Sequence, residues 1–361
     1  MNTMFYSSAP ARVCLYGEHQ DYLQLNVIPA AINLRLSIKS RFSSKNKIII
    51  HSRDLNQTTA ISTTINTLRN KIGSLESYLE AGIIALKNLN PDMKIPALNI
   101  SIESQIPIAS GLSSSAALLV GWIQHISGIM ELDFDKSHIA ELAYDAEHNI
   151  LGIPCGKMDQ YACSYGNIIR LSSIEPPEVV KLNIPEVNLI VVDSQTPKLT
   201  SDVHGRKVKK IKETVNRFEI LAKVDLRDIS MEILTKKRLE LSNSDFNILQ
   251  GIISIKECTE IAEKELSKSK PDICLLGELL TTQHKALKEK IEVSLPILDK
   301  IVEESISLGA LGGKLTGAGL GGSVVIMTQN NTEKIAENLK KNLGLPVKVV
   351  EIDEGANFEI I

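Results

Sequence analysis

The stretch PIASGLSSSAALLV, residues 107–120, is the segment from which the fold can be argued. It follows a run that reads as a strand, passes through a small flexible turn, and then opens a helix with three consecutive serines. The first backbone N–H groups of a helix have no partner within the helix and lie at the positive end of its dipole. Small side chains let a phosphate approach those groups, whereas one serine is enough for a helix cap. Taken alone, the stretch fits a phosphate-binding turn and a serine-rich cap about equally well.

The composition of the chain is ordinary for a soluble globular protein. Its 361 residues suffice for two domains, with 43% hydrophobic and 23% charged residues. The net charge of −3 gives no sign of the basic face that nucleic-acid binding requires. We therefore expect no nucleic acid among its partners. No membrane is expected among them either, and the expected assembly is a monomer or weak dimer.

The start of the chain and its cysteines indicate a compartment. The opening MNTMFYSSAP lacks the basic and apolar regions of a signal peptide. The longest apolar run, near AALLVGWI, is far shorter than the roughly 20 residues of a membrane span. The five cysteines form no C-x-x-C pair, and an odd number fits a reducing compartment. We expect a cytoplasmic protein.

Hydrophobic periodicity predicts an α+β protein. Strands are expected at residues 27–42, 46–52, 97–108, 167–173, 188–194, 321–329 and 346–352, and helices at 74–89, 113–129, 135–150 and 332–344. The segment 200–308 reads as mainly helical. The polar stretch 173–187 contains three prolines, so we place a domain boundary at its end. The expected domains are residues 1–187 and 188–361.

Two further segments carry charged residues in unusual settings. In ARVCLYGEHQDY, residues 11–22, the dense charges fit a solvated turn better than a sugar site by about two to one. In AEHNILGIPCGKMDQYACSYGN, residues 146–167, Asp159 has largely apolar neighbours and needs a partner. A helix cap and a catalytic carboxylate are equally good readings of Asp159.

A glycine-rich segment, GGKLTGAGLGGSVVIM, spans residues 312–327. Its six glycines permit close approach to a ligand, and a plain hairpin is the less favoured reading. The segment is not a P-loop, because Leu315 follows Lys314 where serine or threonine is required. The serine stretch is likewise no nucleophile elbow, since Ser115 stands where that motif needs glycine.

In this order, the four segments resemble the motifs of the GHMP small-molecule kinases and, within that family, of the galactokinases. GEHQDY is similar to the galactokinase signature, PIASGLSSSAAL to the family's phosphate loop, AEHNILGIPCGKMDQY to the segment with the catalytic aspartate, and KLTGAGLGGSVV to the third family motif. The helix-like HKALKEKIEVSLPILD also resembles its galactokinase counterpart, so the resemblance runs from about residue 9 to 327. It implies an N-terminal α/β domain and a C-terminal ferredoxin-like domain, with the active site in the cleft between them.

The resemblance also implies roles for individual residues. Asp159 would accept a proton from the sugar C1 hydroxyl, with Arg12 beside it favouring the ionised carboxylate. Ser115 and Glu147 would hold Mg²⁺. The residues implied to contact ATP are Ala109, Ser110, Gly111, Leu112, Ser113, Ser114, Ser115, Ala116, Gly317 and Gly319. Those implied to contact the sugar are Glu18, His19, Asp21, Gly156 and His204. Tyr78 and Leu79 are weak candidates for the adenine pocket.

Several positions depart from the galactokinase pattern. Ala11 and Cys14 stand where glycine and asparagine are usual, and His204 where a sugar-contacting tyrosine is usual. The paired glycines that often follow the first signature are replaced by LQLN, residues 23–26. Lys157 stands where an apolar residue is usual. A solvent-facing Lys157 is the favoured reading, by about three to one over one that pairs with a sugar carboxylate.

Three functions therefore remain open at this point. An ATP-dependent sugar 1-kinase acting on galactose ranks first. A sister kinase for arabinose, a uronic acid or an N-acetylated sugar ranks second. A catalytically silent paralogue that senses sugar and ATP ranks third, since such paralogues lose part of the phosphate loop and GLSSSAA is complete here.

Overall fold

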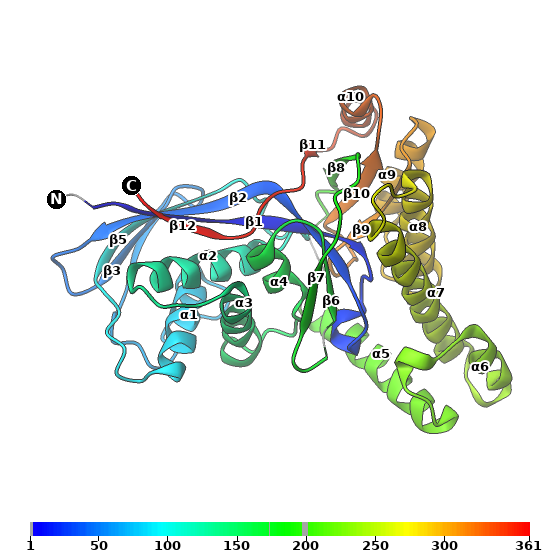
Figure 1. Cartoon of the computed structure of the whole chain (residues 1–361), viewed down its shortest axis with the longest axis horizontal. Helices are drawn as coiled ribbons and strands as arrows, with labels where there is room; N and C mark the ends of the chain where they lie inside the picture. Colours follow the sequence, from blue (N-terminus) through cyan, green and yellow to red (C-terminus); the bar gives the residue numbers. More distant parts are fainter. Residues whose placement is uncertain (1–2, 173, 197–200) are drawn as a thin grey trace.

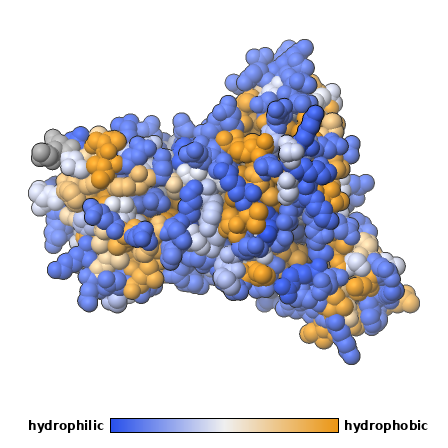
Figure 2. Space-filling view, viewed as in Figure 1, coloured by the Kyte–Doolittle hydropathy of each residue, from blue (hydrophilic) through white to orange (hydrophobic). Residues whose placement is uncertain are grey.

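The computed structural model describes residues 3–172, 174–196 and 201–361, with the side chains of residues 201–204 outside the description. The chain forms two halves, each built on its own sheet, that meet near the centre of an elongated molecule (Figure 1). Hydrophilic side chains cover most of the face shown in Figure 2, and a hydrophobic area lies near the junction of the halves. None of the helices in the described ranges combines the length and apolar character that crossing a membrane would require.

The N-terminal half has a six-stranded sheet in the order β12-β1-β2-β5-β3-β4, in which only β3 and β5 pair in parallel. Its strands are β1 (Phe5–Tyr16), β2 (Ile28–Phe42), β3 (Ile48–Ser52), β4 (Gln57–Ile61), β5 (Leu98–Ser104) and β12 (Asn357–Ile360). The helices beneath it are α1 (Leu75–Leu89), α2 (Ser114–Ile129), α3 (Lys136–Tyr144), a π-helix (Asp145–Ile150) and α4 (Met158–Tyr165). Strands β6 (Ile169–Ser172) and β7 (Glu178–Lys181) form a separate hairpin.

The C-terminal half has a four-stranded antiparallel sheet in the order β11-β8-β10-β9. Its strands are β8 (Asn188–Asp193), β9 (Gly312–Thr316), β10 (Ser323–Thr328) and β11 (Val347–Val350). Its helices are α5 (Ser201–Ala222), α6 (Met231–Lys236), α7 (Asn243–Leu266), α8 (Ile273–Ala286), a π-helix (Leu287–Ile291), α9 (Pro296–Ser307) and α10 (Thr332–Leu343). Short 3-10 helices occupy Asp21–Leu23, Leu226–Asp228 and Arg238–Glu240.

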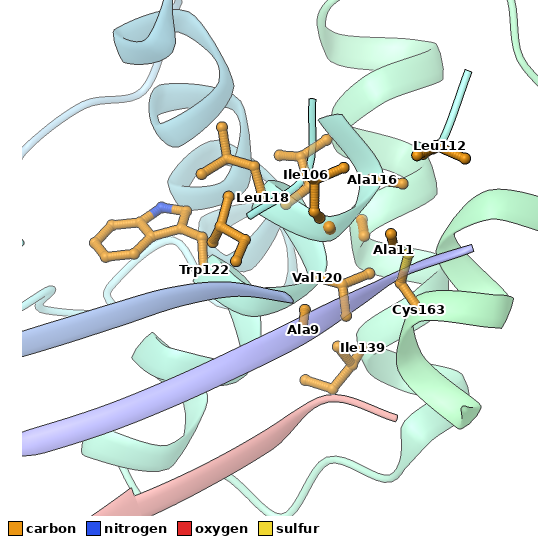
Figure 3. Packing of buried hydrophobic residues seen from close by; sticks show 14 of the residues in the cluster. Ala9, Ala11, Ile106, Leu112, Ala116, Leu118, Val120, Trp122, Ile139 and Cys163 are labelled. Carbon is orange, nitrogen blue, oxygen red and sulfur yellow. The ribbon is translucent and has the colours of Figure 1, made fainter. Parts of the chain in front are cut away.

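Helix α2 is the central buried element of the N-terminal half. It packs on β1 through small residues: a Cβ added at Gly121 would lie 3.4 Å from the Cβ of Ala9. Figure 3 shows Val120 of α2 close to Ala9. Trp122, which has no exposed surface, donates its indole N–H to the Leu79 carbonyl of α1 at 3.0 Å. This packing holds the N-terminus of α2 beside the end of β1.

The elements match the α+β expectation, with differences at several boundaries. The strand expected over residues 97–108 ends at Ser104, and the helix expected over 135–150 changes to a π-helix at Asp145. The sequence of residues 11–22 also reads as strand, turn and strand, but its second strand is wrong, because a turn and a 3-10 helix follow Tyr16. Strands β4, β7, β9 and β12 are not among the expected strands. The domain boundary after residue 187 stays a prediction, and β12 returns to pair with β1.

Candidate active site

A cleft of about 370 Å³ lies where the two halves meet. It is bordered by the end of β1 and its following turn, the π-helix, the start of α4, part of α5 and the glycine-rich turn between β9 and β10. The lining residues are Arg12, Glu18, His19, Asp21, Tyr22, Tyr78, Ser115, Glu147, His148, Ile153, Pro154, Cys155, Gly156, Met158, Asp159, Val208, Lys212, Gly317, Ala318, Gly319 and Leu320. Most of the residues expected at the site from the sequence are therefore brought together.

Arg12 and Asp159 form a two-pronged ion pair at the base of this cleft. The Arg12 Nε and one terminal nitrogen donate to the two Asp159 oxygens at 2.7 and 2.8 Å. Arg12 is only 3% exposed, and its remaining terminal nitrogen donates to the Gly111 carbonyl at 2.6 Å. The register of β1 against β2 shifts on both sides of Arg12, and such bulges re-aim a side chain. The local strand geometry thus directs the guanidinium toward α4 and the serine turn.

The serine turn has the backbone of an anion site. Ala109, Gly111 and Ser113 all have positive φ angles, between 58° and 86°. Ser113 occupies the N-cap of α2, yet its hydroxyl does not cap the helix; it donates to Asp159 Oδ2 at 2.6 Å. The first N–H groups of α2 therefore rely on another partner, and a phosphate is the kind of group that suits them. The same turn is tied directly to the Asp159 carboxylate.

The glycine-rich turn of the C-terminal half lies against this serine turn. A Cβ added at Gly317 would be 3.0 Å from the Gly111 carbonyl oxygen, and one at Gly322 would be 3.0 Å from that of Ser110. Ser323 donates its hydroxyl to the Ser110 carbonyl at 2.7 Å. Glycines are needed here because any side chain would separate the two turns. The expected partnership of both turns around one ligand is consistent with this contact.

Ser115 and Glu147 lie together at one side of the cleft. Glu147 sits on the π-helix, is 5% exposed, and accepts hydrogen bonds from Ser115 and from Gln160, the latter at 2.7 Å. Burial raises the pKa of Glu147 above its ordinary value, and the two hydrogen bonds oppose that rise. A carboxylate and a hydroxyl are oxygen ligands of the type that Mg²⁺ prefers. No cluster of three or more His, Cys, Asp or Glu ligands occurs in the described parts of the chain, so phosphate and water would complete such a site.

Four of the residues expected to contact a sugar also line the cleft: Glu18, His19, Asp21 and Gly156. Glu18 Oε2 accepts hydrogen bonds from Lys314 Nζ at 3.0 Å and from the Gly317 N–H at 2.9 Å. His19 contacts the Tyr22 hydroxyl at 2.9 Å through Nδ1 and the Ala318 carbonyl at 3.2 Å through Nε2. These contacts hold both side chains in place at the edge of the cleft.

Asp21 lies directly over Gly156. A Cβ at Gly156 would fall 1.7 Å from Asp21 Oδ2, so only glycine leaves room for this carboxylate. Burial and repulsion from Asp159 raise the pKa of Asp21 to about 6. The Asp21 carboxyl changes from its neutral to its ionised form around this pKa, so its strength as an acceptor for a hydroxyl depends on pH.

Lys157 and Leu79 differ from their expected positions, and the expectation for His204 is not tested. The solvent-facing reading of Lys157 is wrong: it is 8% exposed and bonds both Glu141 oxygens at 2.8 and 2.9 Å, and Glu175 at 2.8 Å. Nor does it line the cleft, so it is not placed to meet a sugar carboxylate. The side chain of His204 lies outside the described residues. Tyr78 lines the cleft, whereas Leu79 is buried in the core.

Other lining residues were missed by the sequence reasoning. Tyr22, Cys155 and Lys212 border the cleft, and Lys314 lies behind Glu18. The feature of the sequence that could have indicated Lys314 is its position in a glycine-rich segment, but the P-loop pattern does not match there and no role for Lys314 followed. Lys212 lies on α5, outside every motif of the sequence, so no motif predicted its position at the cleft.

Comparisons with known proteins show the family to which the chain belongs. The family GHMP kinases N terminal domain matches residues 77–167, GHMP kinases C terminal matches 262–344, and the Galactokinase galactose-binding signature matches 2–38. A galactokinase of Pyrococcus furiosus is 30% identical over 329 residues, covering 90% of this chain and 89% of the relative. A galactokinase of Lactococcus lactis is 26% identical over 380 residues, covering 97% and 91%.

Solved structures show the same fold. The Lactococcus lactis galactokinase in complex with galactose superposes with a TM-score of 0.87 at 23% identity, covering 98% of this chain and 95% of the other. The Methanococcus jannaschii mevalonate kinase gives a TM-score of 0.73 at 23% identity, covering 97% and 98%. At these identities the likeness establishes the fold rather than the substrate.

Proposed function

Because the chain belongs to the GHMP kinase family, and within it to the galactokinases, we propose that it transfers the γ-phosphoryl group of ATP to the C1 hydroxyl of D-galactose. The products are galactose 1-phosphate and ADP. One observation carries the proposal: the Asp159 carboxylate is bonded at once to the buried Arg12 and to Ser113 of the serine turn. A proton acceptor and a phosphate-binding turn therefore share one position in the cleft.

Asp159 is proposed to orient the C1 hydroxyl and accept its proton as the new O–P bond forms. The bond between the γ-phosphorus and the bridging oxygen of ADP breaks at the same time. The positive charge of Arg12 favours the ionised form of Asp159, which makes the carboxylate available but weakly basic. A weak base suffices where the transition state is loose and the proton leaves late. The main work of the protein is then to align the two substrates and neutralise charge.

The phosphates are proposed to lie between the two turns. The N–H groups at the start of α2 would donate to them, and the glycines from Gly317 to Gly322 would cover them. Ser115 and Glu147 would hold Mg²⁺, which would supply positive charge to neutralise the phosphates. Sugar hydroxyls other than that at C1 are assigned to Glu18, His19 and Asp21, and Gly156 and His204 are proposed as further sugar contacts.

The enzyme is further proposed to act in the cytoplasm as a monomer or weak dimer. The two domains proposed are residues 1–187 and 188–361. Light scattering after size exclusion, at protein concentrations spanning about two orders of magnitude, tests the assembly. A stable tetramer would contradict it.

The function is tested by a panel of free sugars with the unmodified enzyme. We expect kcat/KM for galactose to exceed that for glucose by a large factor, because buried polar groups matched to one hydroxyl are left unpaired when it is inverted. Arabinose, galacturonate and N-acetylgalactosamine complete the panel. If one of these three outranks galactose by tenfold or more, a sister kinase replaces the galactokinase assignment. If galactose binds and no sugar is phosphorylated, the protein is a sensor.

A further inference from the structure

Lys314 is a buried cation that reaches from the C-terminal half into the N-terminal half. It lies on β9, has no exposed surface, and donates from Nζ to the Cys14 carbonyl at 2.7 Å and to Glu18 Oε2 at 3.0 Å. An ammonium group away from water is stable only with such partners. Both partners lie in the segment that forms the end of β1 and its turn.

The C-terminal half places a second donor on the same Glu18 oxygen. The backbone N–H of Gly317, three residues after Lys314, donates to Oε2 at 2.9 Å. Two donors on one oxygen fix the rotation of the carboxylate. Because Glu18 also lines the cleft, this rotation determines how the carboxylate faces a ligand.

Neighbouring contacts make the same connection along a short seam. The Cys14 N–H donates to Thr316 Oγ1 at 2.9 Å, and His19 contacts the Ala318 carbonyl at 3.2 Å. Residues 314–318 therefore follow residues 14–19 step by step. The glycine-rich turn, which continues from this seam, touches the serine turn at its other end.

The charge balance of the cleft also depends on Lys314. Four carboxylates border it, those of Glu18, Asp21, Glu147 and Asp159. Arg12 is bound to Asp159 by two hydrogen bonds, so Lys314 is the cation in direct contact with Glu18. The counter-ion of Glu18 therefore comes from the C-terminal half of the chain.

We propose that Lys314 is a positioning residue for sugar recognition, holding Oε2 of Glu18 so that the other oxygen accepts a hydroxyl of the sugar. The proposal rests on the proposed function, because it requires a sugar in this cleft. It also makes the sugar site depend on the glycine-rich strand β9 of the C-terminal half. A merely structural lysine would stabilise the fold without changing sugar affinity.

The test is a double-mutant cycle on galactose binding, measured by calorimetry without ATP. The variants are Lys314→Met, Glu18→Gln and the pair together. We expect each single variant to weaken galactose binding by roughly tenfold or more, the scale of a lost hydrogen bond to a charged group. Because Lys314 acts through Glu18, the double variant should bind galactose within about twofold of Glu18→Gln. Steady-state rates should show a raised KM for galactose with the KM for ATP nearly unchanged.

The neutral double variant also covers the case in which Lys314→Met does not fold, since it leaves no unpaired buried charge. Lys157→Met is the matched control: it removes another buried lysine paired with glutamates, but one outside the cleft lining. It should bind galactose as the wild type does. Lys314→Met with unchanged galactose affinity would overturn the inference, as would a double variant tenfold weaker than Glu18→Gln. A wild type that binds no galactose overturns the proposed function, and this inference with it.

Discussion

At the scale of single residues, the site depends on what the Asp159 carboxylate contacts. Arg12 donates hydrogen bonds to both oxygens, and the Ser113 hydroxyl donates to one of them instead of capping its own helix. Such a carboxylate is held in one orientation and kept ionised. Two of the three consecutive serines therefore have different hydrogen-bond partners: Ser113 is bonded to Asp159 and Ser115 to Glu147.

Asp21 is predicted to make sugar affinity dependent on pH. Its pKa is raised to about 6 by burial and by the charges of Asp159 and Glu18, while Arg12 and the Tyr22 N–H oppose the rise. Below pH 6 the neutral carboxyl is a poorer acceptor, so KM for galactose should rise by up to about tenfold per pH unit. The measurement is KM for galactose from pH 7.5 to pH 5, with saturating ATP.

Asp21→Asn supplies the control for this pH effect. It should abolish the rise in KM at low pH while weakening galactose at pH 7.5. Because the folded pKa lies above the ordinary value of 3.8, ionised Asp21 costs stability at neutral pH, and this cost declines as the pH falls from about 6 towards that ordinary value. The variant should therefore melt at a higher temperature than the wild type at pH 7.5. A KM that stays flat down to pH 5 would refute the role given to Asp21.

Ser115→Ala and Glu147→Ala are predicted to raise the Mg²⁺ concentration needed for half-maximal activity. Each removes one protein oxygen from a site that phosphate and water otherwise complete. We expect a shift of about tenfold for Glu147→Ala and less for Ser115→Ala, with galactose affinity little changed. A Mg²⁺ titration of both variants provides the measurement. Unchanged metal dependence in both would rule out this pair as ligands.

At the scale of elements, irregular backbone places the functional side chains. The shifts in register beside Arg12, the π-helix that carries Glu147 and the 3-10 helix that begins at Asp21 all interrupt regular elements at the cleft. π-helical turns, such as the one that carries Glu147, occur often at functional sites. The sequence predicts the regular parts of these elements from their periodicity, but the interruptions depend on tertiary contacts that periodicity does not contain.

Several site features could be read from the sequence, and several could not. The serine turn and Asp159 stand out because their residue types are unusual for a helix start and an apolar segment. Lys157 was misread because its partners, Glu141 and Glu175, lie on other elements. Lys314 was missed for the same reason, since its partner Glu18 is 296 positions away. Contacts across such distances become visible only in the folded chain.

Lys157 is predicted to secure the start of α4 against α3. It bonds Glu141, which also accepts the Tyr161 hydroxyl at 2.5 Å. Lys157→Met should lower the free energy of unfolding by roughly 1–3 kcal/mol, because it removes the contacts with both glutamates. The loss stays within this range because the two glutamates are partly exposed and regain water. Urea denaturation gives the value. A variant as stable as the wild type would show that this ion pair contributes nothing to the fold.

At the scale of the whole molecule, the end of the chain joins the two halves. After β11 the chain leaves the C-terminal sheet, and β12 pairs with β1 at the edge of the N-terminal sheet (Figure 1). Phe358 of β12 stacks on Phe5 with ring centroids 6.2 Å apart, and its ring fills the space beside Gly128 of α2. Motion of one half relative to the other is thus limited by the pairing of β12 with β1 as well as by the contacts between the halves at the cleft.

Phe358→Ala is predicted to test the structural value of this return. The half-buried ring should contribute about 2 kcal/mol, so the melting temperature should fall by several degrees. Catalysis should be unaffected below that temperature, because Phe358 does not line the cleft. Scanning calorimetry and a standard rate assay check both parts. A large loss of kcat without a loss of stability would show that β12 acts on the active site.

The central claim is that the cleft between the halves phosphorylates the C1 hydroxyl of galactose with Asp159 as the proton acceptor. Its most direct test follows ³¹P NMR spectra of galactose, ATP and Mg²⁺ with the wild type and with Asp159→Asn. We expect galactose 1-phosphate and ADP in equal amounts from the wild type. For Asp159→Asn, we expect the same product at a rate lower by roughly a hundredfold or more, with ATP binding retained. Phosphorylation at another hydroxyl, or near-normal turnover by Asp159→Asn, would contradict the account.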